Sequence, residues 1–581
     1  MEDKYEKISR LAKRRGFFWQ SYEIYGGIGG FISLGPLGVG LKNNIIEKWR
    51  EVFVKPYRET IVEIETPIIT PSKVFEASGH IEHFTDYIVE CVKCGRKFRA
   101  DHLLEEKGLT GLEGLREEEL NRLIAEKGVK CPECGGTLGP VSKFNLLFKT
   151  TIGPYSEQVG YARPETAQGM FLNFHRIYEV MGRKLPLGIA QIGRVMRNEI
   201  SPRQGPIRLR EFTIMEIELF FDPLNPSCTY LEEVAGERIS ILRYGNREPI
   251  KIKVVEALEE GFIANEWNAF FMALAKKFLN YLGIPDDKQM FVEKGPQEKA
   301  HYSSQTFDQV VLTERWGWVE VSGHAYRTDY DLKKHMEYSG RDLRAYRFKG
   351  EGEVRKVLQV KPIVKNIIRD FGKDKLPAIL SNLNSLDGRK VVEALSKGGL
   401  ELNIEGIGSI KLNNEHLIVV EREEKDYVER FLPHVAEPSF GIERLLYVVL
   451  EYSYRERKGR IILSLPKELA PIKVAVFPLV KEEGLCRIAK EIYGKLKKEG
   501  LTVILEEEGS IGKRYAKADE IGIPFAITVD RQSLEDSTVT VRDRDSWRQV
   551  RVNIGELPKF INRLLREGAL QALEQPSRYP P

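Results

Sequence analysis

The chain has 581 residues, 42% hydrophobic and 30% charged, so it can bury several domain cores and is neither disordered nor collagen-like. Its 89 basic and 85 acidic residues leave a net charge of only +4, which excludes a uniformly polycationic nucleic-acid coat but allows a local basic groove. It lacks the run of about 18 apolar residues that a membrane helix needs, and its N-terminus lacks a secretory apolar core. We therefore expect a cytoplasmic protein without a membrane partner.

Apolar spacing predicts a chain that mixes helices and strands. Helices are expected, in chain order, at residues 4–15, 41–53, 166–181 and 439–454, with a mostly helical stretch at 228–283. Strands are expected at residues 60–69, 308–312 and 317–322, and on both sides of the helix at 166–181. After residue 466 the pattern becomes β-α-β-α-β, which predicts a separate compact α/β domain.

Two CxxC pairs give the clearest chemical signal. Cys91 and Cys94 form one pair and Cys131 and Cys134 the other, and each pair is followed by glycine. Two thiolates on each tight turn would complete a tetrahedral set of four, which suits structural zinc without an open catalytic position. A charged segment with helical spacing separates the pairs, which lie further apart than in common zinc sites. The alternative is four reduced thiols.

Arginines and carboxylates surround a predicted hairpin that reads QIGRVMRNE, then a loop, then RLREFTIME. Because alternate residues of a strand share a face, Arg197 and Glu199 should point the same way, and so should Arg208, Phe212 and Glu216. An aromatic ring beside arginines suits a nucleotide, since the ring stacks on the base and the guanidinium groups bind phosphates. The alternative is a solvated face with alternating salt bridges.

The segment EPSFGIER begins an apolar helix, LLYVVL. A helix N-terminus that is preceded by Gly441 and carries Arg444 suits a polyphosphate group. The alternative is an ordinary cap with a surface arginine. Elsewhere, His80-Ile-Glu-His83 imitates the HIGH nucleotide motif, but Glu82 replaces the glycine, so we expect no nucleotide there.

In order, these segments resemble the three signature motifs of class II aminoacyl-tRNA synthetases, and in detail the dimeric glycyl-tRNA synthetases of archaea and eukaryotes. The resemblance spans nearly the whole chain and rests on GPLGVGLKNNI, SGHIEHFTD, FRADHLLE, RPETAQGMFLNF, QIGRVMRNEISPR, REFTIMEIE, EPSFGIER and SIGKRYAKADEIGIPF. It implies an α+β multidomain fold: a six-stranded antiparallel catalytic sheet flanked by helices, motif 1 at a homodimer interface, and a C-terminal α/β anticodon-binding domain.

The implied domains follow the order of the motifs. They are 1–90, the N-terminal part of the catalytic domain with motif 1; 91–142, a four-cysteine zinc-knuckle-like insertion; 143–345, the catalytic core with motif 2 and a helical insertion at about 225–300; 346–433, an α+β insertion; 434–465, the core with motif 3; and 466–581, the anticodon-binding domain.

The resemblance also implies the reaction. Such a ligase activates glycine with ATP to glycyl-adenylate and pyrophosphate, then transfers the glycyl group to the 3′ end of tRNA(Gly). Its partners are therefore glycine, ATP, tRNA(Gly) and a second copy of the chain, with no DNA, and Mg²⁺ would bridge the phosphates. No protein nucleophile is needed, because positioning and charge stabilisation suffice.

Carried onto this sequence, Arg197 and Arg444 match the catalytic arginines, at the α-phosphate and the γ-phosphate respectively. Phe212 would stack on adenine, Glu199 would accept a hydrogen bond from the adenine amine, and Glu320 would lie on the magnesium side. The ATP-binding set is Arg197, Asn198, Glu199, Ile207, Arg208, Leu209, Arg210, Glu211, Phe212, Glu320, Val321, Gly441 and Arg444.

Glycine has no side chain to recognise, and a pocket gains only about 1–3 kcal/mol per methyl group, so selection must come from exclusion. The family surrounds the ammonium group with carboxylates and a serine, and an arginine closes over the substrate. The glycine-binding set is Arg99, Glu165, Phe212, Glu216, Glu437, Ser439 and Gly441.

For tRNA, the loop at residues 201–205 is expected near the acceptor end. Arg542, Asp543 and Arg544 could read anticodon bases. Basic residues of the first helix, namely Arg10, Lys13, Arg14 and Arg15, could contact phosphates or form a solvated face. Two alternatives stay open: a class II synthetase for another amino acid such as proline, threonine or histidine, and a non-enzymatic paralogue. The acids and arginines above argue against both.

Overall fold

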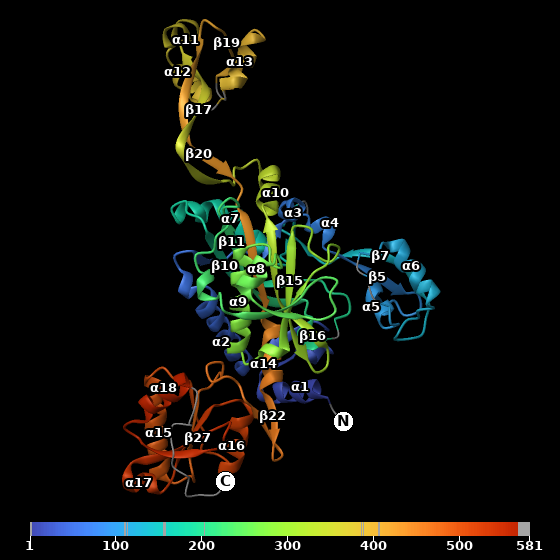
Figure 1. Cartoon of the computed structure of the whole chain (residues 1–581), viewed down its shortest axis with the longest axis vertical. Helices are drawn as coiled ribbons and strands as arrows, with labels where there is room; N and C mark the ends of the chain where they lie inside the picture. Colours follow the sequence, from blue (N-terminus) through green and yellow to red (C-terminus); the bar gives the residue numbers. More distant parts are fainter. Residues whose placement is uncertain are drawn as a thin grey trace. The chain divides into compact units, whose positions relative to one another are not determined.

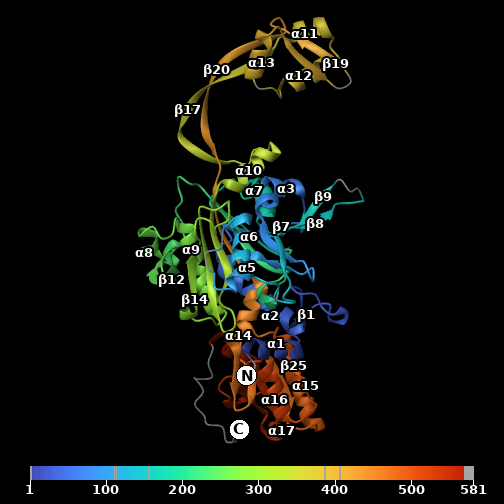
Figure 2. The same ribbon diagram turned by 90° about the vertical axis from the view of Figure 1, so that its right-hand side faces the viewer.

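The computed structural model describes residues 3–109, 112, 114–154, 158–202, 204–384, 386, 388–404 and 407–567. They form two compact units: one contains the residues up to Leu343 and from Leu432 onward, and the other is Arg344–Phe431 (Figures 1 and 2). The second range overlaps the insertion expected at 346–433. Residue 203 of the loop expected near tRNA, and residues 568–581 of the last domain, lie outside the described residues. No helix in the described ranges is long and apolar enough to cross a membrane.

A nine-stranded sheet forms the centre of the first unit, in the order β13-β12-β14-β15-β16-β21-β11-β10-β3. Its neighbours are antiparallel except for the parallel pairs β12–β14 and β10–β3. The strands are β3 (Ile61–Ile64), β10 (Leu187–Met196), β11 (Glu211–Phe221), β12 (Arg238–Leu242), β13 (Ile250–Lys253), β14 (Gln289–Glu293), β15 (Gln305–Thr313), β16 (Gly317–Thr328) and β21 (His434–Gly441). This largely antiparallel sheet confirms the predicted fold class.

Helices pack on both faces of this sheet. Successive residues of β11 point to opposite sides, so both faces present apolar side chains. Leu219 and Phe221 join the main core with α2 (Pro36–Phe53), α9 (Glu266–Tyr281) and α14 (Ile442–Ser453). Phe220, between them, packs on Phe174 of α7 (Ala167–Val180), with ring centroids 4.3 Å apart. Glu216 shares the alternation of Phe220, so it points to the face on which α7 lies.

Two sequence expectations about this sheet were wrong. The segment expected to be mostly helical contains β12 and β13, which extend one edge of the sheet beyond the six mutually antiparallel strands that the resemblance implies, β14-β15-β16-β21-β11-β10. Ile239 and Ile241 alternate there with polar residues, which is the period of a strand. The helix expected from Ser439 begins only at Ile442, because β21 continues to Gly441.

The cysteine pairs lie in an insertion with its own three-stranded sheet, ordered β6-β5-β7. Its elements are β5 (Thr85–Cys91), β6 (Lys97–Arg99), α5 (Ala100–Glu105), α6 (Glu117–Glu126) and β7 (Leu138–Asn145). Val89, Phe98, Leu104 and Leu120 form a small core between sheet and helices. The helix α6 lies between the two cysteine pairs in sequence, as the spacing predicted.

Short elements complete the first unit outside the cysteine insertion and the C-terminal part. They are α1 (Lys4–Arg15), β1 (Phe18–Gln20), β2 (Ile32–Leu34), β4 (Ile69–Pro71), α3 (Ser72–Ala77), α4 (His80–His83), β8 (Phe148–Thr151), β9 (Val159–Ala162), α8 (Val254–Glu259), α10 (Tyr330–Ser339), β22 (Tyr454–Arg457) and β23 (Arg460–Leu463).

The C-terminal part has a five-stranded sheet in the order β25-β24-β26-β27-β28. Its elements are β24 (Val474–Pro478), α15 (Glu483–Lys498), β25 (Val503–Leu505), α16 (Ile511–Glu520), β26 (Phe525–Val529), α17 (Gln532–Asp536), β27 (Thr538–Asp543), β28 (Gln549–Asn553) and α18 (Leu557–Glu567). Strands β24, β25 and β26 are parallel, as the β-α-β-α-β pattern predicts, and β27 and β28 extend the sheet antiparallel.

The second unit consists of a long antiparallel ribbon and a small domain with its own core. The ribbon pairs β17 (Ala345–Pro362) with β20 (Leu417–Phe431), so that Ala345 lies opposite Phe431. The small domain contains α11 (Val364–Phe371), α12 (Leu376–Asn384), α13 (Gly388–Ser396), β18 (Leu400–Ile404) and β19 (Gly408–Leu412). Ile367, Ile379 and Leu412 are buried in its core.

Candidate active site

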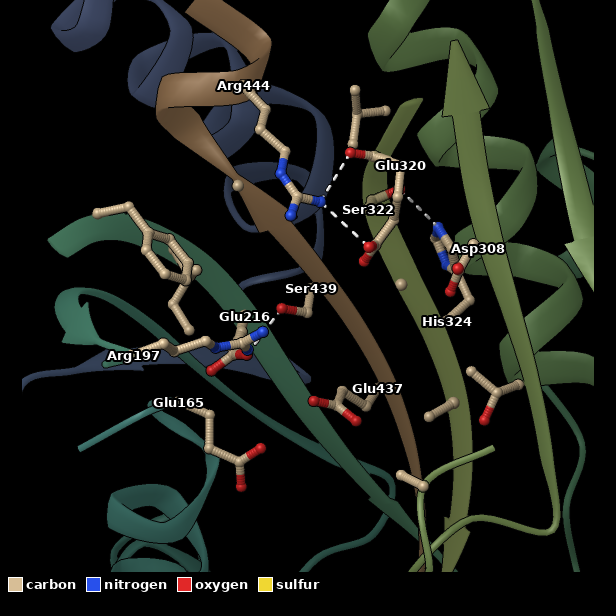
Figure 3. A pocket seen from close by; sticks show the side chains of 18 of the residues that line it. Glu165, Arg197, Glu216, Asp308, Glu320, Ser322, His324, Glu437, Ser439 and Arg444 are labelled. Carbon is tan, nitrogen blue, oxygen red and sulfur yellow. Dashed lines mark hydrogen bonds and ion pairs between the residues drawn. The ribbon is translucent and has the colours of Figure 1, made fainter. Parts of the chain in front are cut away.

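A cavity of about 360 Å³ opens over the large sheet, bounded by β11, β15, β16, β21 and the first turn of α14 (Figure 3). Most residues predicted to bind ATP or glycine line it: Glu165, Arg197, Glu199, Ile207, Arg208, Leu209, Phe212, Glu216, Glu320, Val321, Glu437, Ser439, Gly441 and Arg444. The fold therefore brings segments from three distant parts of the sequence to one place.

The two ends of this cavity differ in their side chains (Figure 3). The arginine end is defined by Arg444, Glu320 and Asp308. The acidic end is defined by Glu165, Glu216 and Glu437. A ligand with phosphates at one end and an ammonium group at the other would match this division of charge.

Glu216 at the acidic end is fixed by hydrogen bonds. The backbone N–H of Thr166 donates to its carboxylate at 2.8 Å, the Thr166 hydroxyl donates to the same oxygen, and Ser439 Oγ donates to the other oxygen at 2.7 Å. The antiparallel register of β11 and β21 places Glu216 directly opposite Ser439. Burial, reinforced by the neighbouring Glu165 carboxylate, raises the pKa of Glu216.

A buried arginine that the sequence analysis missed joins the acidic groups. Arg327 Nη1 donates to Glu437 at 3.0 Å, its Nε donates to Asp331 at 2.9 Å, and its Nη2 lies 3.5 Å from Glu165. Its guanidinium lies over the Tyr302 ring, 3.6 Å from the centroid. The spacing of four residues between Arg327 and Asp331 could have indicated an ion pair. The strand predicted at residues 317–322 ended before this arginine, whereas β16 continues to Thr328.

The carboxyl groups of the acidic end differ in their protonation. Burial, with repulsion from Glu216 and Glu165, raises the pKa of Glu437 to about 8, although Arg327 acts in the opposite direction. Burial would also raise the pKa of Glu165, but Arg327 and His80 hold it well below its usual range. His80 Nε2 lies 3.4 Å from Glu165, so the histidine of the rejected HIGH-like motif supports the acidic end instead.

At the arginine end, Arg444 lies in the first turn of α14, whose N-terminus favours negative charge. Its Nη1 donates to the Glu320 carboxylate at 3.1 Å and to the Glu320 carbonyl at 2.9 Å, while Nε donates to the Ile207 carbonyl at 2.7 Å. Desolvation would raise the pKa of Glu320, but the Arg444 guanidinium lowers it. Burial and Glu320 raise the pKa of Asp308 to about 7.

An aromatic ring and two further arginines also line the cavity. The Arg197 guanidinium lies 5.3 Å from the Phe212 ring centroid, and Arg208 Nε lies 3.6 Å from a Glu199 oxygen. Strand alternation does not place these side chains as expected, since β10 ends before Arg197 and β11 begins after Arg208. The loop between the strands turns Arg197, Glu199 and Arg208 into the cavity.

Some predicted residues do not line the cavity, namely Arg99, Asn198, Arg210 and Glu211. Arg99 Nη1 pairs with Asp86 at 3.0 Å within the cysteine insertion. Arg210 donates to a main-chain carbonyl of the hairpin loop, and Glu211 pairs with Arg194 at 2.6 Å. Ion pairs thus hold Arg99 and Glu211, and of these residues Arg210 supports the hairpin loop.

The four cysteines of the insertion lie together. Ligand sulfur atoms of Cys91, Cys94, Cys131 and Cys134 are all within 4.8 Å of one another. A Cβ atom at Gly136 would lie 3.0 Å from Cys91 Sγ and 3.2 Å from Cys134 Sγ, so glycine keeps the space around the thiols open. The donor set and its geometry fit one tetrahedral metal ion that prefers sulfur.

Arg542 and Arg544, which the sequence analysis predicts to read anticodon bases, both have internal partners in the structure. Arg542 pairs with Asp519 through two hydrogen bonds of 2.8 and 3.0 Å, inside the C-terminal domain. Arg544 is 2% exposed and donates to the carbonyls of Gly522 and Leu465. Buried guanidinium groups need such partners, so these arginines stabilise the domain.

Asp543 and the basic first helix also form internal contacts. Asp543 accepts hydrogen bonds from the backbone and hydroxyl of Ser546. Arg14 and Arg15 both pair with Glu520, at 3.1 and 2.5 Å, and Lys13 pairs with Glu23. These pairs favour the interpretation of this helix as a structural element over direct phosphate contacts.

Comparison with known proteins gives a consistent result across the chain. Residues 473–564 match the family described as "Anticodon binding domain". Proteins named glycine–tRNA ligase are similar over nearly the full chain. That of Aeropyrum pernix is 50% identical over 576 residues (98% of each chain), and that of Pyrococcus horikoshii is 48% identical over 570 residues (97% of this chain, 99% of the relative). That of Methanocaldococcus jannaschii is 44% identical over 578 residues (97% and 100%).

Solved structures with the same fold include two of prolyl-tRNA synthetase from Cryptosporidium parvum, both 15% identical to this chain. The complex with L-proline and AMP has a TM-score of 0.50 and covers 96% of this chain and 75% of the other. The complex with halofuginone and AMPPNP has a TM-score of 0.51, with coverages of 97% and 77%. At this identity the likeness concerns the fold alone.

Proposed function

Because the chain belongs to the family of glycine–tRNA ligases, class II synthetases that charge tRNA(Gly) with glycine at the expense of ATP, we propose that the cavity over the large sheet is where glycine and ATP react. One observation supports this assignment above all. A single cavity holds Arg444, in the first turn of a helix, at one end and a cluster of carboxylates at the other. Phosphates suit the first end and an ammonium group suits the second.

In the proposed activation step, a carboxylate oxygen of glycine bonds to the α-phosphorus of ATP, and the bond from that phosphorus to pyrophosphate breaks. Arg197, which lines the cavity, holds the α-phosphate and the glycine carboxylate. Arg444 holds the γ-phosphate, and Phe212 stacks on adenine while Glu199 accepts from its amine. Preorganised cations lower the barrier because they are already aimed at the charge that builds up on the phosphates.

Glycine is proposed to bind with its ammonium group at the acidic end, against Glu165, Glu216, Glu437 and Ser439. Arg327 and the rings beside it fill the space behind these acids, so a larger side chain would have to displace buried groups. Overpacking of that kind typically costs about 1–3 kcal/mol or more. Arg99 would have to leave Asp86 to close over the substrate.

Two metals complete the proposal. Mg²⁺ prefers hard oxygen ligands, and Glu320 and Asp308 offer them where the phosphates would lie. When bound, the ion neutralises phosphate charge. A structural Zn²⁺ would be held by the four cysteines of the insertion, which lie apart from the large sheet in sequence and carry no reacting group.

We further propose a cytoplasmic homodimer with the domain division given by the sequence motifs. The helix α2 and the edge strand β3 are the elements that match motif 1. Val39 on α2 is 45% exposed, and Tyr22 and Tyr25, just before it in the chain, are 52% and 85% exposed. Exposed apolar side chains on this helix and just before it favour a partner surface there.

Replacing Glu437 tests the assignment of the acidic end. Glu437→Gln keeps the shape but removes an anion beside the ammonium group, so the KM for glycine in ATP–pyrophosphate exchange should rise about tenfold to hundredfold. The KM for ATP should change little. Glu451→Gln, a buried glutamate of α14 outside the cavity, is the matched control. Equal losses for glycine and ATP would refute the assignment.

A further inference from the structure

A lysine at the arginine end has no part in the reaction as described so far. Lys294 directly follows β14, and it is the one lysine among the described residues that line the cavity. Its Nζ lies 2.8 Å from Asp308 Oδ2. Its backbone N–H donates to the Thr306 carbonyl at 2.9 Å, which continues the β14–β15 ladder. The main chain is thus fixed, while the side chain is 31% exposed and can change partners.

Two ion pairs stand close together at this end of the cavity. One joins Lys294 to Asp308 and the other joins Arg444 to Glu320. Figure 3 shows the Asp308, Glu320 and Arg444 side chains grouped above the acidic end. Lys294 and Arg444 both act electrostatically on Glu320, so the two cations share one region. Each cation is held there by a carboxylate that a stronger anion could replace.

We propose that Lys294 is a third phosphate ligand of the activation step, which exchanges Asp308 for the β- and γ-phosphates when ATP enters. This inference rests on the proposed ATP site. As the glycine carboxylate oxygen bonds to the α-phosphorus, the bond to the bridging oxygen breaks and its electron pair leaves with pyrophosphate. Lys294 and Arg444 together stabilise the negative charge that develops on this leaving group, and no proton has to move.

The chemistry of lysine suits such an exchange. Its ammonium group is a compact charge on a flexible stem, with three donors that do not require the fixed bidentate geometry of arginine. It can therefore follow the phosphates from the ground state to the departing pyrophosphate. Arg444 is held by three hydrogen bonds and fixes the position, whereas the partly exposed Lys294 side chain, paired with Asp308, supplies adjustable charge.

Comparing ATP with AMP tests the inference without relying on activity. In calorimetry with the full-length protein, Lys294→Met should weaken binding of magnesium–ATP about tenfold or more, the usual loss for one charge-assisted contact. AMP, which lacks the β- and γ-phosphates, should bind as in the wild type. Lys294→Arg should recover part of the ATP affinity. Lys288→Met, at a solvent-exposed pair with Asp287, is the control and should change neither affinity.

The two half-reactions provide a second readout. Lys294→Met should slow glycyl-adenylate formation by about tenfold or more, yet transfer from preformed glycyl-adenylate to tRNA should be unchanged, because pyrophosphate has already left. Equal weakening of ATP and AMP, or slowing of both half-reactions, would show that Lys294 only supports the fold around Asp308. Wild-type ATP affinity in the variant would also overturn the inference. Failure of the wild-type protein to bind ATP would instead overturn the proposed ATP site.

Discussion

Glu437, at the acidic end, is subject to opposing effects on its pKa. Burial and two neighbouring glutamates favour its neutral form, whereas Arg327 favours its anion, and the balance raises its pKa to about 8. An incoming ammonium group adds a second cation and favours the anion further. At any pH at which Glu437 is protonated in the empty site, glycine should therefore bind with loss of that proton.

This proton loss predicts a pH dependence. Below pH 8 the empty site keeps Glu437 protonated, so the KM for glycine should fall as pH rises from 6 to 8, by up to about tenfold per unit, and then level off. The measurement is ATP–pyrophosphate exchange at varied glycine and saturating ATP. In Glu437→Gln the slope should be much smaller. A wild-type KM that stays constant over this range would contradict the account.

The raised pKa also affects the stability of the empty protein. The pKa of Glu437 in the folded protein lies above its ordinary value of 4.5, so its contribution to stability is complete below pH 4.5. That contribution is lost as pH rises through 8, because the unfolded chain releases this proton at lower pH than the folded protein does. Bound glycine opposes this loss, since it supplies the missing cation.

At the scale of elements, the sequence predicted the parts with strong local patterns. The apolar stripe of α2, the β-α-β-α-β order after residue 466 and the helix between the cysteine pairs all appear in the structure. Strands β12 and β13 were missed because they are short and lie next to long helical patterns. The end of β21 was misplaced because Gly441 continues a strand at the point where its sequence also suits a helix cap.

The candidate site shows a similar limit. Residues in recognisable motifs, such as Arg197, Glu216 and Arg444, could be named from the sequence. Arg327 and Lys294 could not, because their role depends on which strands neighbour one another, and that order is a long-range property of the sheet. Strand alternation alone also failed for Arg197, which a loop and not a strand turns into the cavity.

The cysteine insertion supports a prediction about metal content. One zinc ion per chain should be measured in the purified protein by elemental analysis, because four thiolates within 4.8 Å leave the set complete. Cys131→Ser should lose the ion and lower the melting temperature of the insertion, since metal binding stabilises such small cores. Cys486→Ser, on α15, is the matched control. Full zinc content in Cys131→Ser would contradict the assignment of the site.

At the scale of the whole molecule, the chain separates binding tasks into parts with their own cores. The large sheet carries the cavity, the C-terminal domain matches an anticodon-binding family, and the second unit has a core of its own. Because Ala345 and Phe431 are paired across the ribbon, the two ends of the second unit lie side by side. Its removal need not disturb the sheet.

Replacing residues 345–431 by a short glycine–serine linker should therefore leave glycine activation intact. Exchange activity should stay within about twofold of the full-length value, as expected when a domain folds on its own core. Aminoacylation of tRNA(Gly), measured in parallel, reports whether the second unit serves the nucleic acid. Loss of exchange from a shortened protein that still unfolds cooperatively would show that the unit also supports the cavity.

The cavity over the large sheet is proposed to activate glycine and to exclude larger amino acids. The most direct test is ATP–pyrophosphate exchange by the wild-type protein with glycine, alanine, serine, proline and threonine in parallel. Exchange is expected with glycine, and kcat/KM with the other amino acids should be lower by about tenfold to hundredfold, the discrimination that filling the space behind the acids should provide. Comparable exchange with alanine or serine would contradict this proposal, because the space beside the α-carbon would then be open.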